Sequence, residues 1–181
     1  VTAAAQTFFN KTLGELAPHE AATLASLPKA PSDYHPVRNA DRLLARRPND
    51  PFLHELKGQI LFESRRFDAA IAAYARAVEL APREPLILAG YGRALLAPDT
   101  PALNARALDV LTRAQAADPF DPRMLRDLSL AHARAGQPGL AAAVAAERYA
   151  VLGRMEDAEA LADRAAGLLP QGSPGWIRAQ D

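Results

Sequence analysis

Two stretches of the sequence place a histidine directly before a glutamate, as the metal site of many zinc-dependent hydrolases does. They are His19-Glu20-Ala21-Ala22-Thr23 and His54-Glu55-Leu56-Lys57-Gly58. Such a site needs a second histidine one helical turn later, so that two imidazoles bind the metal while the glutamate acts as the base. Both stretches lack that histidine, and the chain has no cysteine that would replace it. The sequence therefore predicts no metal site, no cofactor and no catalytic residue.

Fifteen prolines give the clearest signal of where helices end and begin. Eight of them form four pairs, whose members are three or four residues apart: Pro48 and Pro51, Pro82 and Pro85, Pro119 and Pro122, Pro170 and Pro174. The first proline of each pair ends a helix, because it has no backbone N–H to donate. The second follows an Asp, Glu or Ser, and proline fits the first helical position after such a capping residue. Each pair therefore predicts the end of one helix and the start of the next.

The composition agrees with a helical chain. Alanine and leucine are abundant while valine and isoleucine are scarce, which favours helices over strands. The 21 basic and 21 acidic residues cancel, which removes the charge expected of a general nucleic-acid binder. No apolar stretch reaches the roughly 18 residues that span a bilayer. The first residues also lack the basic segment and apolar core of a signal peptide. We therefore expect an all-α protein, with neither a membrane-spanning segment nor a signal peptide in this sequence.

The distance between the proline pairs is that of a structural repeat. Their first members are 34, 37 and 51 residues apart. A period of 34 residues resembles the tetratricopeptide repeat (TPR), a pair of antiparallel helices that stacks on its neighbours into a superhelix. Three copies start at Pro51, Pro85 and Pro122, and three extra residues near Asp99 lengthen the second. Residues in the register of the repeat are Gly58, Ala70, Tyr74, Ala77, Leu88, Tyr91, Gly92, Ala107, Leu111, Ala114, Leu125, Leu128, Ser129 and Ala141.

Two parts of the array depart from the repeat. The first copy has His54 where tryptophan is usual and Lys57 where leucine is usual. The last spacing equals one repeat plus one further helix, so the end of the array is compressed. We expect helices at about 138–151 and 155–168 with Gly153 between them, and a short helix from Pro174 that docks Trp176 on the array.

Residues 1–47 do not fit this period. We expect helices near residues 2–9 and from Pro18, then a proline-rich loop at 28–36. The short motifs of this segment are Phe8-Phe9-Asn10-Lys11, Glu20-Ala21-Ala22, Leu24-Ala25, Leu27-Pro28-Lys29-Ala30-Pro31-Ser32, Tyr34, Pro36 and Asn39. Across residues 3–47 they resemble the last motif of the peptidoglycan glycosyltransferase domain of class A penicillin-binding proteins. That family's catalytic carboxylates lie in earlier motifs, which are absent here, and we interpret Ser26 with Lys29 as a chance match to its transpeptidase motif Ser-x-x-Lys.

Residues 47–181 carry a second resemblance. The motifs are Arg47-Pro48-Asn49-Asp50-Pro51-Phe52, His54-Glu55-Leu56-Lys57-Gly58-Gln59, Leu61-Phe62-Glu63-Ser64 and Leu169-Pro170-Gln171-Gly172-Ser173-Pro174-Gly175-Trp176. They resemble the C-terminal TPR region of bacterial periplasmic zinc metalloproteases, in which the protease domain precedes the repeats. We therefore predict two parts, a helical and proline-rich segment at 1–47 and a TPR domain at 48–181, joined as in a chimeric chain. The end of the first part, 41–47, is expected to finish a helix that Pro48 closes.

The TPR resemblance implies where a partner would bind. Such arrays bind partners on a concave surface lined by the first helix of each repeat. By register, the candidate groove residues are Glu55, Gln59, Phe62, Arg93, Arg123, Arg126 and Arg134. The groove is expected to be acidic and aromatic at one end and basic at the other. The arginines of the third copy would bind a carboxylate or an acidic segment through paired hydrogen bonds; the alternative is a solvated helix face. The Lys and Asn set with which some TPR domains hold a C-terminal carboxylate is missing from the first copy.

Three hypotheses for function follow. The first is a non-catalytic TPR module of the bacterial periplasm or cell envelope, which binds a peptide or protein segment in its groove. The second is an accessory part of an envelope enzyme, either a zinc metalloprotease or a peptidoglycan glycosyltransferase, whose catalytic domain lies outside these residues. The third is a composite chain with no function of its own. None of them assigns catalysis or nucleic-acid binding to these residues.

Overall fold

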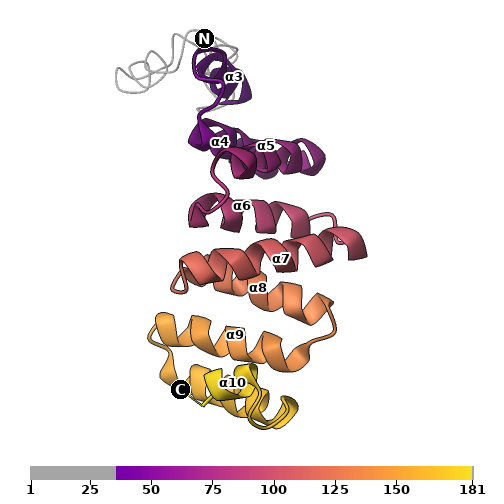
Figure 1. Ribbon diagram of the computed structural model, residues 1–181, viewed down its shortest axis with the longest axis vertical. Coiled ribbons are helices and arrows are strands. Elements are labelled where there is room, and N and C mark those ends of the chain that lie inside the picture. The colour runs from indigo at the N-terminus through magenta and orange to yellow at the C-terminus, as the bar shows by residue number, and fades with distance from the viewer. Residues whose placement is uncertain (1–35, 181) are drawn as a thin grey trace, which may run out of the picture. The chain divides into compact units, whose positions relative to one another are not determined.

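The fold is built from α-helices joined by short turns (Figure 1). The computed structural model describes residues 36–180, and the chain divides into two compact units, Val1–Asn39 and Ala40–Asp181. The helices are α3 Pro36–Arg46, α4 Pro51–Glu63, α5 Phe67–Leu80, α6 Pro85–Leu96, α7 Pro101–Ala117, α8 Pro122–Arg134, α9 Pro138–Val151, α10 Met155–Leu168 and α11 Pro174–Arg178. No strand occurs among the described residues. The helices expected at residues 2–9 and from Pro18 lie outside them, and the division at residue 47 stays a prediction.

The proline pairs mark helix boundaries as expected. Helices α4, α6, α8 and α11 each begin at the second proline of a pair. The side chain of Asp50 accepts hydrogen bonds from the backbone of the first turn of α4, and Asp121 and Ser173 do the same for α8 and α11. Glu84 precedes α6 without a side-chain capping bond. The start of a helix is therefore specified locally by proline and its cap.

Successive helices pack as antiparallel pairs. Helix α4 pairs with α5, α6 with α7, and α8 with α9, while α5 contacts α6 and α7 contacts α8 (Figure 1). The first helices also meet one another, since α6 contacts both α4 and α8. This is the stacking of a TPR-like superhelix, so the predicted fold class is confirmed.

The compressed end of the array has a structural explanation in its turns. The turn between α4 and α5 contains Arg65 at φ 58°, and the turn between α8 and α9 contains Gly136 at φ 71°. The same left-handed position recurs as Gly153 at φ 73° between α9 and α10. Helix α9 packs closely on both α8 and α10. It therefore serves as the second helix of one hairpin and the first of the next, and the helices predicted at 138–151 and 155–168 are present.

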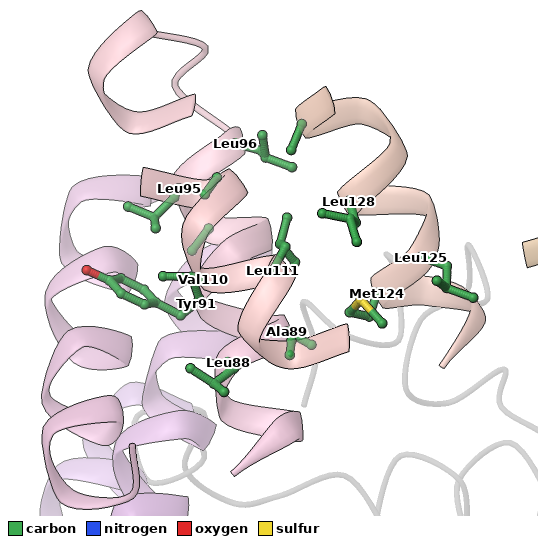
Figure 2. Packing of buried hydrophobic residues seen from close by; sticks show 14 of the residues in the cluster. Leu88, Ala89, Tyr91, Leu95, Leu96, Val110, Leu111, Met124, Leu125 and Leu128 are labelled. Atoms are coloured by element: carbon green, nitrogen blue, oxygen red, sulfur yellow. The ribbon is translucent and has the colours of Figure 1, made fainter. Parts of the chain in front are cut away.

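The core of the array lies between its hairpins (Figure 2). Tyr74 and Tyr91, which are both in the register of the repeat, are buried. Gly58 and Gly90 lie against the Tyr74 ring from two different helices, at distances that leave no room for a Cβ atom. Small residues at the helix crossings therefore let the helices approach around the ring. The largest fully buried side chains are Ile87, Leu88, Leu95, Leu111, Met124, Leu125 and Leu128.

The last helix docks on the array. Helix α11 contacts α9, and a Cβ atom at Gly175 would lie 2.7 Å from a methyl group of Leu140. Arg178 of α11 pairs with Glu147 of α9. Trp176 is partly buried there. A short C-terminal helix is thus held to α9 by close packing and by an ion pair.

Candidate functional site

The first helices α4, α6 and α8 carry all seven candidate groove residues. On α4, Glu55 is half-buried, and Gln59 donates a hydrogen bond from Nε2 to Oε1 of Glu63 at 3.1 Å. Phe62 packs against Phe67 of the same hairpin, with ring centroids 5.6 Å apart. Its ring therefore belongs in large part to the hairpin interior, and Glu55 and Gln59 are the candidates on α4 that remain open to a ligand.

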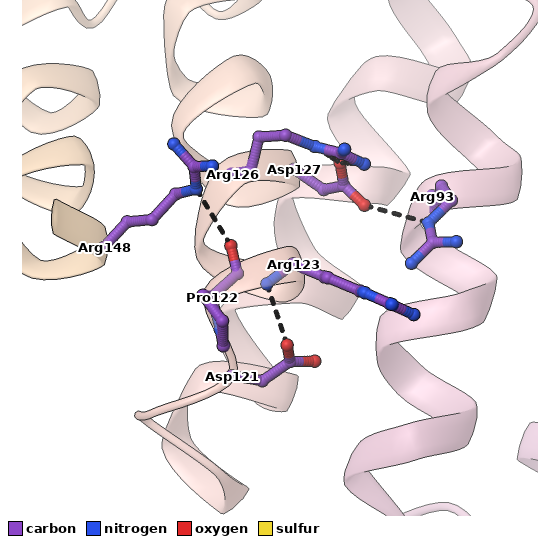
Figure 3. A network of polar contacts seen from close by, with 7 residues as sticks. All are labelled: Arg93, Asp121, Pro122, Arg123, Arg126, Asp127 and Arg148. Atoms are coloured by element: carbon purple, nitrogen blue, oxygen red, sulfur yellow. Dashed lines mark hydrogen bonds and ion pairs between the residues drawn. The ribbon is translucent and has the colours of Figure 1, made fainter. Parts of the chain in front are cut away.

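A buried carboxylate organises the basic end of the site (Figure 3). Asp127 of α8 has only 6% of its side chain exposed. Its Oδ2 accepts a hydrogen bond from Nε of Arg93 on α6 at 3.2 Å. Its Oδ1 accepts hydrogen bonds from Nε and Nη2 of Arg126 at 2.9 and 2.8 Å. Asp127 thus joins two of the predicted arginines across neighbouring helices, a role that sequence reasoning missed.

Arg123 completes this cluster. Its backbone N–H donates to Oδ1 of Asp121 at 2.8 Å, as the cap of α8 requires. Its side chain extends from α8 toward α6, on the side where Arg93 lies (Figure 3). Within residues 36–180 the Arg123 guanidinium has no hydrogen-bond or ion-pair partner. We name Arg93, Arg123, Arg126 and Asp127 the arginine cluster; it contains three positive charges and one negative charge.

Arg134, the last residue of α8, directs its guanidinium to a different place, the C-terminal end of α6. Its Nη1 donates to the backbone oxygen of Leu96 at 2.7 Å and to Oδ1 of Asn104 at 3.2 Å. Its Nε lies 3.2 Å from Oδ1 of Asp99, a residue with a positive φ of 52°. Arg134 therefore holds the lengthened turn between α6 and α7, and the structure does not bring it together with the arginine cluster.

The electrostatics change from α4 to α6. Burial raises the pKa of Glu55 above its ordinary value. Burial also raises the pKa of Tyr74, and the negative charge of Glu55 raises it further, whereas the positive charge of Arg93 lowers it. The carboxylate of Glu55 and the guanidinium of Arg93 thus shift the pKa of Tyr74 in opposite directions. Among the candidate groove residues, the carboxylate thus lies on α4 and the guanidinium groups lie on α6 and α8; the change of the groove from acidic to basic stays a prediction.

Large apolar side chains are exposed on these first helices. Phe52 of α4 is 50% exposed, Leu86 of α6 is 56% exposed and Leu130 of α8 is 42% exposed. Leu86 lines a hollow of about 270 Å³ together with Ala89 and Met124. Each of the three first helices thus exposes a large apolar side chain to solvent.

Among residues 36–180 no three His, Asp or Glu side chains are grouped as metal ligands would be. No helix in the same range is both long and apolar enough to cross a bilayer.

The stacked hairpins and the absence of strands from residues 36–180 define the class as an α-helical repeat protein. A family model described as tetratricopeptide repeat matches residues 37–97 and 103–151. These segments make up more than half of the chain, so the chain belongs to the tetratricopeptide repeat family. A second model, described as transglycosylase, matches residues 1–50. This match supports the predicted resemblance of the N-terminal segment to the glycosyltransferase domain.

Curated relatives match either the repeats or the N-terminal segment. Cytochrome c-type biogenesis protein CycH of Rhizobium meliloti (strain 1021) is 36% identical over 94 residues, which are 52% of this chain and 25% of that protein. Penicillin-binding protein 1A of Rickettsia felis is 55% identical over 47 residues, 26% of this chain and 6% of that protein. The Escherichia coli (strain K12) protein of the same name is 51% identical over 47 residues, with the same coverage. The chain thus spans a quarter or less of the length of these relatives.

Solved structures agree on the fold. The crystal structure of MamA has a TM-score of 0.53 and 19% identity, covering 72% of this chain and 85% of that chain. A thermophilic TPR protein of Thermus thermophilus has a TM-score of 0.50 and 18% identity, covering 80% of this chain and 87% of that chain. At these identities the likeness concerns the fold alone.

Proposed function

We propose that this chain is a non-catalytic protein-interaction module of the bacterial cell envelope, which binds a peptide or protein segment on the face formed by α4, α6 and α8. The observation that carries the proposal is that each of these helices exposes a large apolar side chain, Phe52 on α4, Leu86 on α6 and Leu130 on α8. A ligand that covers them removes apolar surface from water, at about 25 cal/mol per Å². Membership of the TPR family supports the same function.

A pair of matched variants tests this placement. Peptides are first selected by phage display on the purified chain. Their affinity is then measured for the wild type and for two variants, Leu86→Asp on α6 and Val151→Asp on α9. Both residues are large, apolar and exposed, but only Leu86 lies on one of the helices α4, α6 and α8. We expect Leu86→Asp to weaken binding tenfold or more and Val151→Asp to leave it unchanged. Loss of binding with Val151→Asp alone would place the ligand on the other side of the hairpins.

The envelope location rests on the likenesses of the two parts of the chain. The N-terminal segment is similar to penicillin-binding protein 1A, and the repeats are similar to a cytochrome c-type biogenesis protein. The resemblance of residues 47–181 to the TPR region of periplasmic zinc metalloproteases adds a further reason and stays a prediction. Fractionation of cells that express the tagged protein tests the location. Recovery from the cytosol alone would contradict it.

A second candidate function follows from the transglycosylase match at residues 1–50. In this alternative the chain is an accessory part of an envelope enzyme, a peptidoglycan glycosyltransferase or a zinc metalloprotease, with the catalytic domain outside these residues. Two assays on the purified chain separate it from an enzyme in its own right. We expect no polymerisation of lipid-linked peptidoglycan precursor, and neither stoichiometric zinc nor cleavage of casein. Zinc at one ion per chain together with casein cleavage would overturn the non-catalytic proposal.

A further inference from the structure

We infer that the arginine cluster is an anion site that selects ligands with acidic side chains, so that the module prefers an extended segment in which Glu or Asp lies between apolar residues. This inference rests on the proposed function and adds the chemistry of the ligand. Three features of the molecule carry it: the charge of the cluster, the donors that remain in it, and the apolar side chains beside it.

The cluster has more positive than negative charge. Asp127 is the carboxylate that pairs with both Arg93 and Arg126. Two positive charges in excess of that carboxylate remain when Arg123 is included. A ligand carboxylate would be attracted to them, and the attraction is stronger beside a protein surface than in bulk water. Removal of all three guanidinium groups from water would cost free energy. Arg93 and Arg126 instead keep 36% and 57% of their side chains exposed. They are therefore open to a ligand.

Several N–H groups in the cluster stay unused. Asp127 accepts a hydrogen bond only from Nε of Arg93, so both terminal nitrogens of that guanidinium can still donate to a ligand. Asp127 also accepts hydrogen bonds from Nε and Nη2 of Arg126, so Nη1 of Arg126 can still donate to a ligand. The Arg123 guanidinium has all its donors available among the described residues. A carboxylate accepts two parallel hydrogen bonds from one guanidinium, and such charge-assisted bonds are among the stronger ones in proteins.

Asp127 is a positioning residue in this site. It bonds Arg93 from α6 and Arg126 from its own helix, so it fixes two long side chains that would otherwise lose conformational entropy on binding. Both guanidinium groups are thus held at the boundary between α6 and α8, toward which Arg123 also extends (Figure 3). Preorganised donors bind an anion more tightly than mobile ones, because less order has to be created.

The neighbouring side chains indicate a segment that passes through the site rather than one that ends there. Leu86 precedes Arg93 by seven residues on α6, so the two share one face of the helix. Leu130 follows Arg123 by seven residues on α8 and shares a face with it in the same way. Both leucines are exposed. Each of the two helices therefore carries one arginine and one exposed leucine on a shared face, in opposite order along the chain. A segment that reaches both helices would meet basic and apolar side chains alternately, so the carboxylate is expected on a side chain and not at a chain terminus.

Fluorescence anisotropy with three labelled peptides tests the inference. The first is an octapeptide of alternating Leu and Glu with an amidated C-terminus, the second has Gln in place of every Glu, and the third is the second peptide with a free C-terminal carboxylate. We expect the Glu peptide to bind at least tenfold more tightly than the Gln peptide. We also expect its affinity to fall when salt is raised, since screening weakens exposed ion pairs.

Matched variants assign the preference to the cluster. Arg123→Glu is expected to weaken the Glu peptide tenfold or more and to leave the Gln peptide unchanged, while Arg123→Lys keeps part of the preference. Arg83→Glu makes the same charge change at an exposed residue of the turn before α6, and it serves as the control. Circular dichroism at 222 nm confirms that each variant is folded.

Each outcome has a distinct meaning. If the Glu and Gln peptides bind equally and Leu86→Asp weakens both, the module binds peptides and the carboxylate preference is wrong. If the third peptide binds as tightly as the Glu peptide, the cluster holds a terminal carboxylate and our assignment to side chains is overturned. If Arg83→Glu has the same effect as Arg123→Glu, the effect reflects net charge and the site is rejected.

Discussion

The contact between Gly58 and Tyr74 supports a quantitative prediction for Gly58→Ala. A Cβ atom at Gly58, in the middle of α4, would lie 2.7, 2.8 and 2.9 Å from three atoms of the Tyr74 ring. Tyr74 is 4% exposed, and Gly90 lies so close to the other edge of the ring that a Cβ atom built there would be only 2.6 Å away, which leaves the ring little room to shift. Overpacking of this kind costs about 1–3 kcal/mol, whereas glycine to alanine within a helix gains up to about 1 kcal/mol. We expect a net loss of up to about 2 kcal/mol in the free energy of unfolding.

Urea unfolding followed by circular dichroism at 222 nm measures this change. Gly167→Ala on α10 is the control, because its Cβ atom would meet no other atom within 4 Å. There only the helical preference of alanine applies, and a gain of up to about 1 kcal/mol is expected. In a Tyr74→Leu background the cost of Gly58→Ala should shrink, since the two residues are in contact. Equal stabilisation by Gly58→Ala and Gly167→Ala would refute the packing of Tyr74 between α4 and α6.

Three further changes test other contacts of the described helices. Arg134→Met should lower the free energy of unfolding by about 1–2 kcal/mol in a urea titration, because it removes hydrogen bonds to the end of α6 and its turn; no change would contradict that role. Gly153→Ala should cost about 1–2 kcal/mol by the same measurement, because the turn holds this residue at φ 73°. Burial raises the pKa of Glu55, because the folded state favours the protonated carboxyl over the carboxylate. This preference stabilises the fold below the ordinary pKa of 4.5, and the stabilisation is lost as the pH rises through the folded-state pKa. Glu55→Gln should therefore be more stable than the wild type near pH 7 and about equal to it near pH 3; stabilisation of the same size at both pH values would contradict the sign of the shift.

The helices were predictable because their boundaries depend on local chemistry. Proline at the first helical position and Asp or Ser before it need no tertiary contact to act. The compressed end of the array was also predictable, because the spacing of 51 residues between Pro119 and Pro170 equals one repeat plus one further helix. Small residues in register, such as Gly58, also pointed to helix crossings that the structure contains.

The site was only partly predictable, because the partners of a charged side chain depend on which helices lie side by side. The sequence placed Arg93 and Arg126 on first helices, but it did not indicate that Asp127 is buried between them. The register gave no signal for this contact, because Asp127 follows Arg93 by 34 residues whereas equivalent positions of the second and third copies are 37 residues apart. The register placed Arg134 among the groove residues, which the structure does not support. The three-residue insertion lengthens the turn after α6, and Asp99 of that turn pairs with the Arg134 guanidinium. Both cases required knowledge of the neighbouring repeat.

The central claim is that ligands bind between α6 and α8 at the arginine cluster. The most direct measurement is a titration of the ¹⁵N-labelled chain with the amidated Leu–Glu octapeptide, observed at the arginine Nε–H resonances. We predict that the resonances of Arg93, Arg123 and Arg126 shift with one common dissociation constant while that of Arg83 stays in place. Shifts confined to other arginines, or no shift at a concentration at which anisotropy shows saturation, would contradict the account.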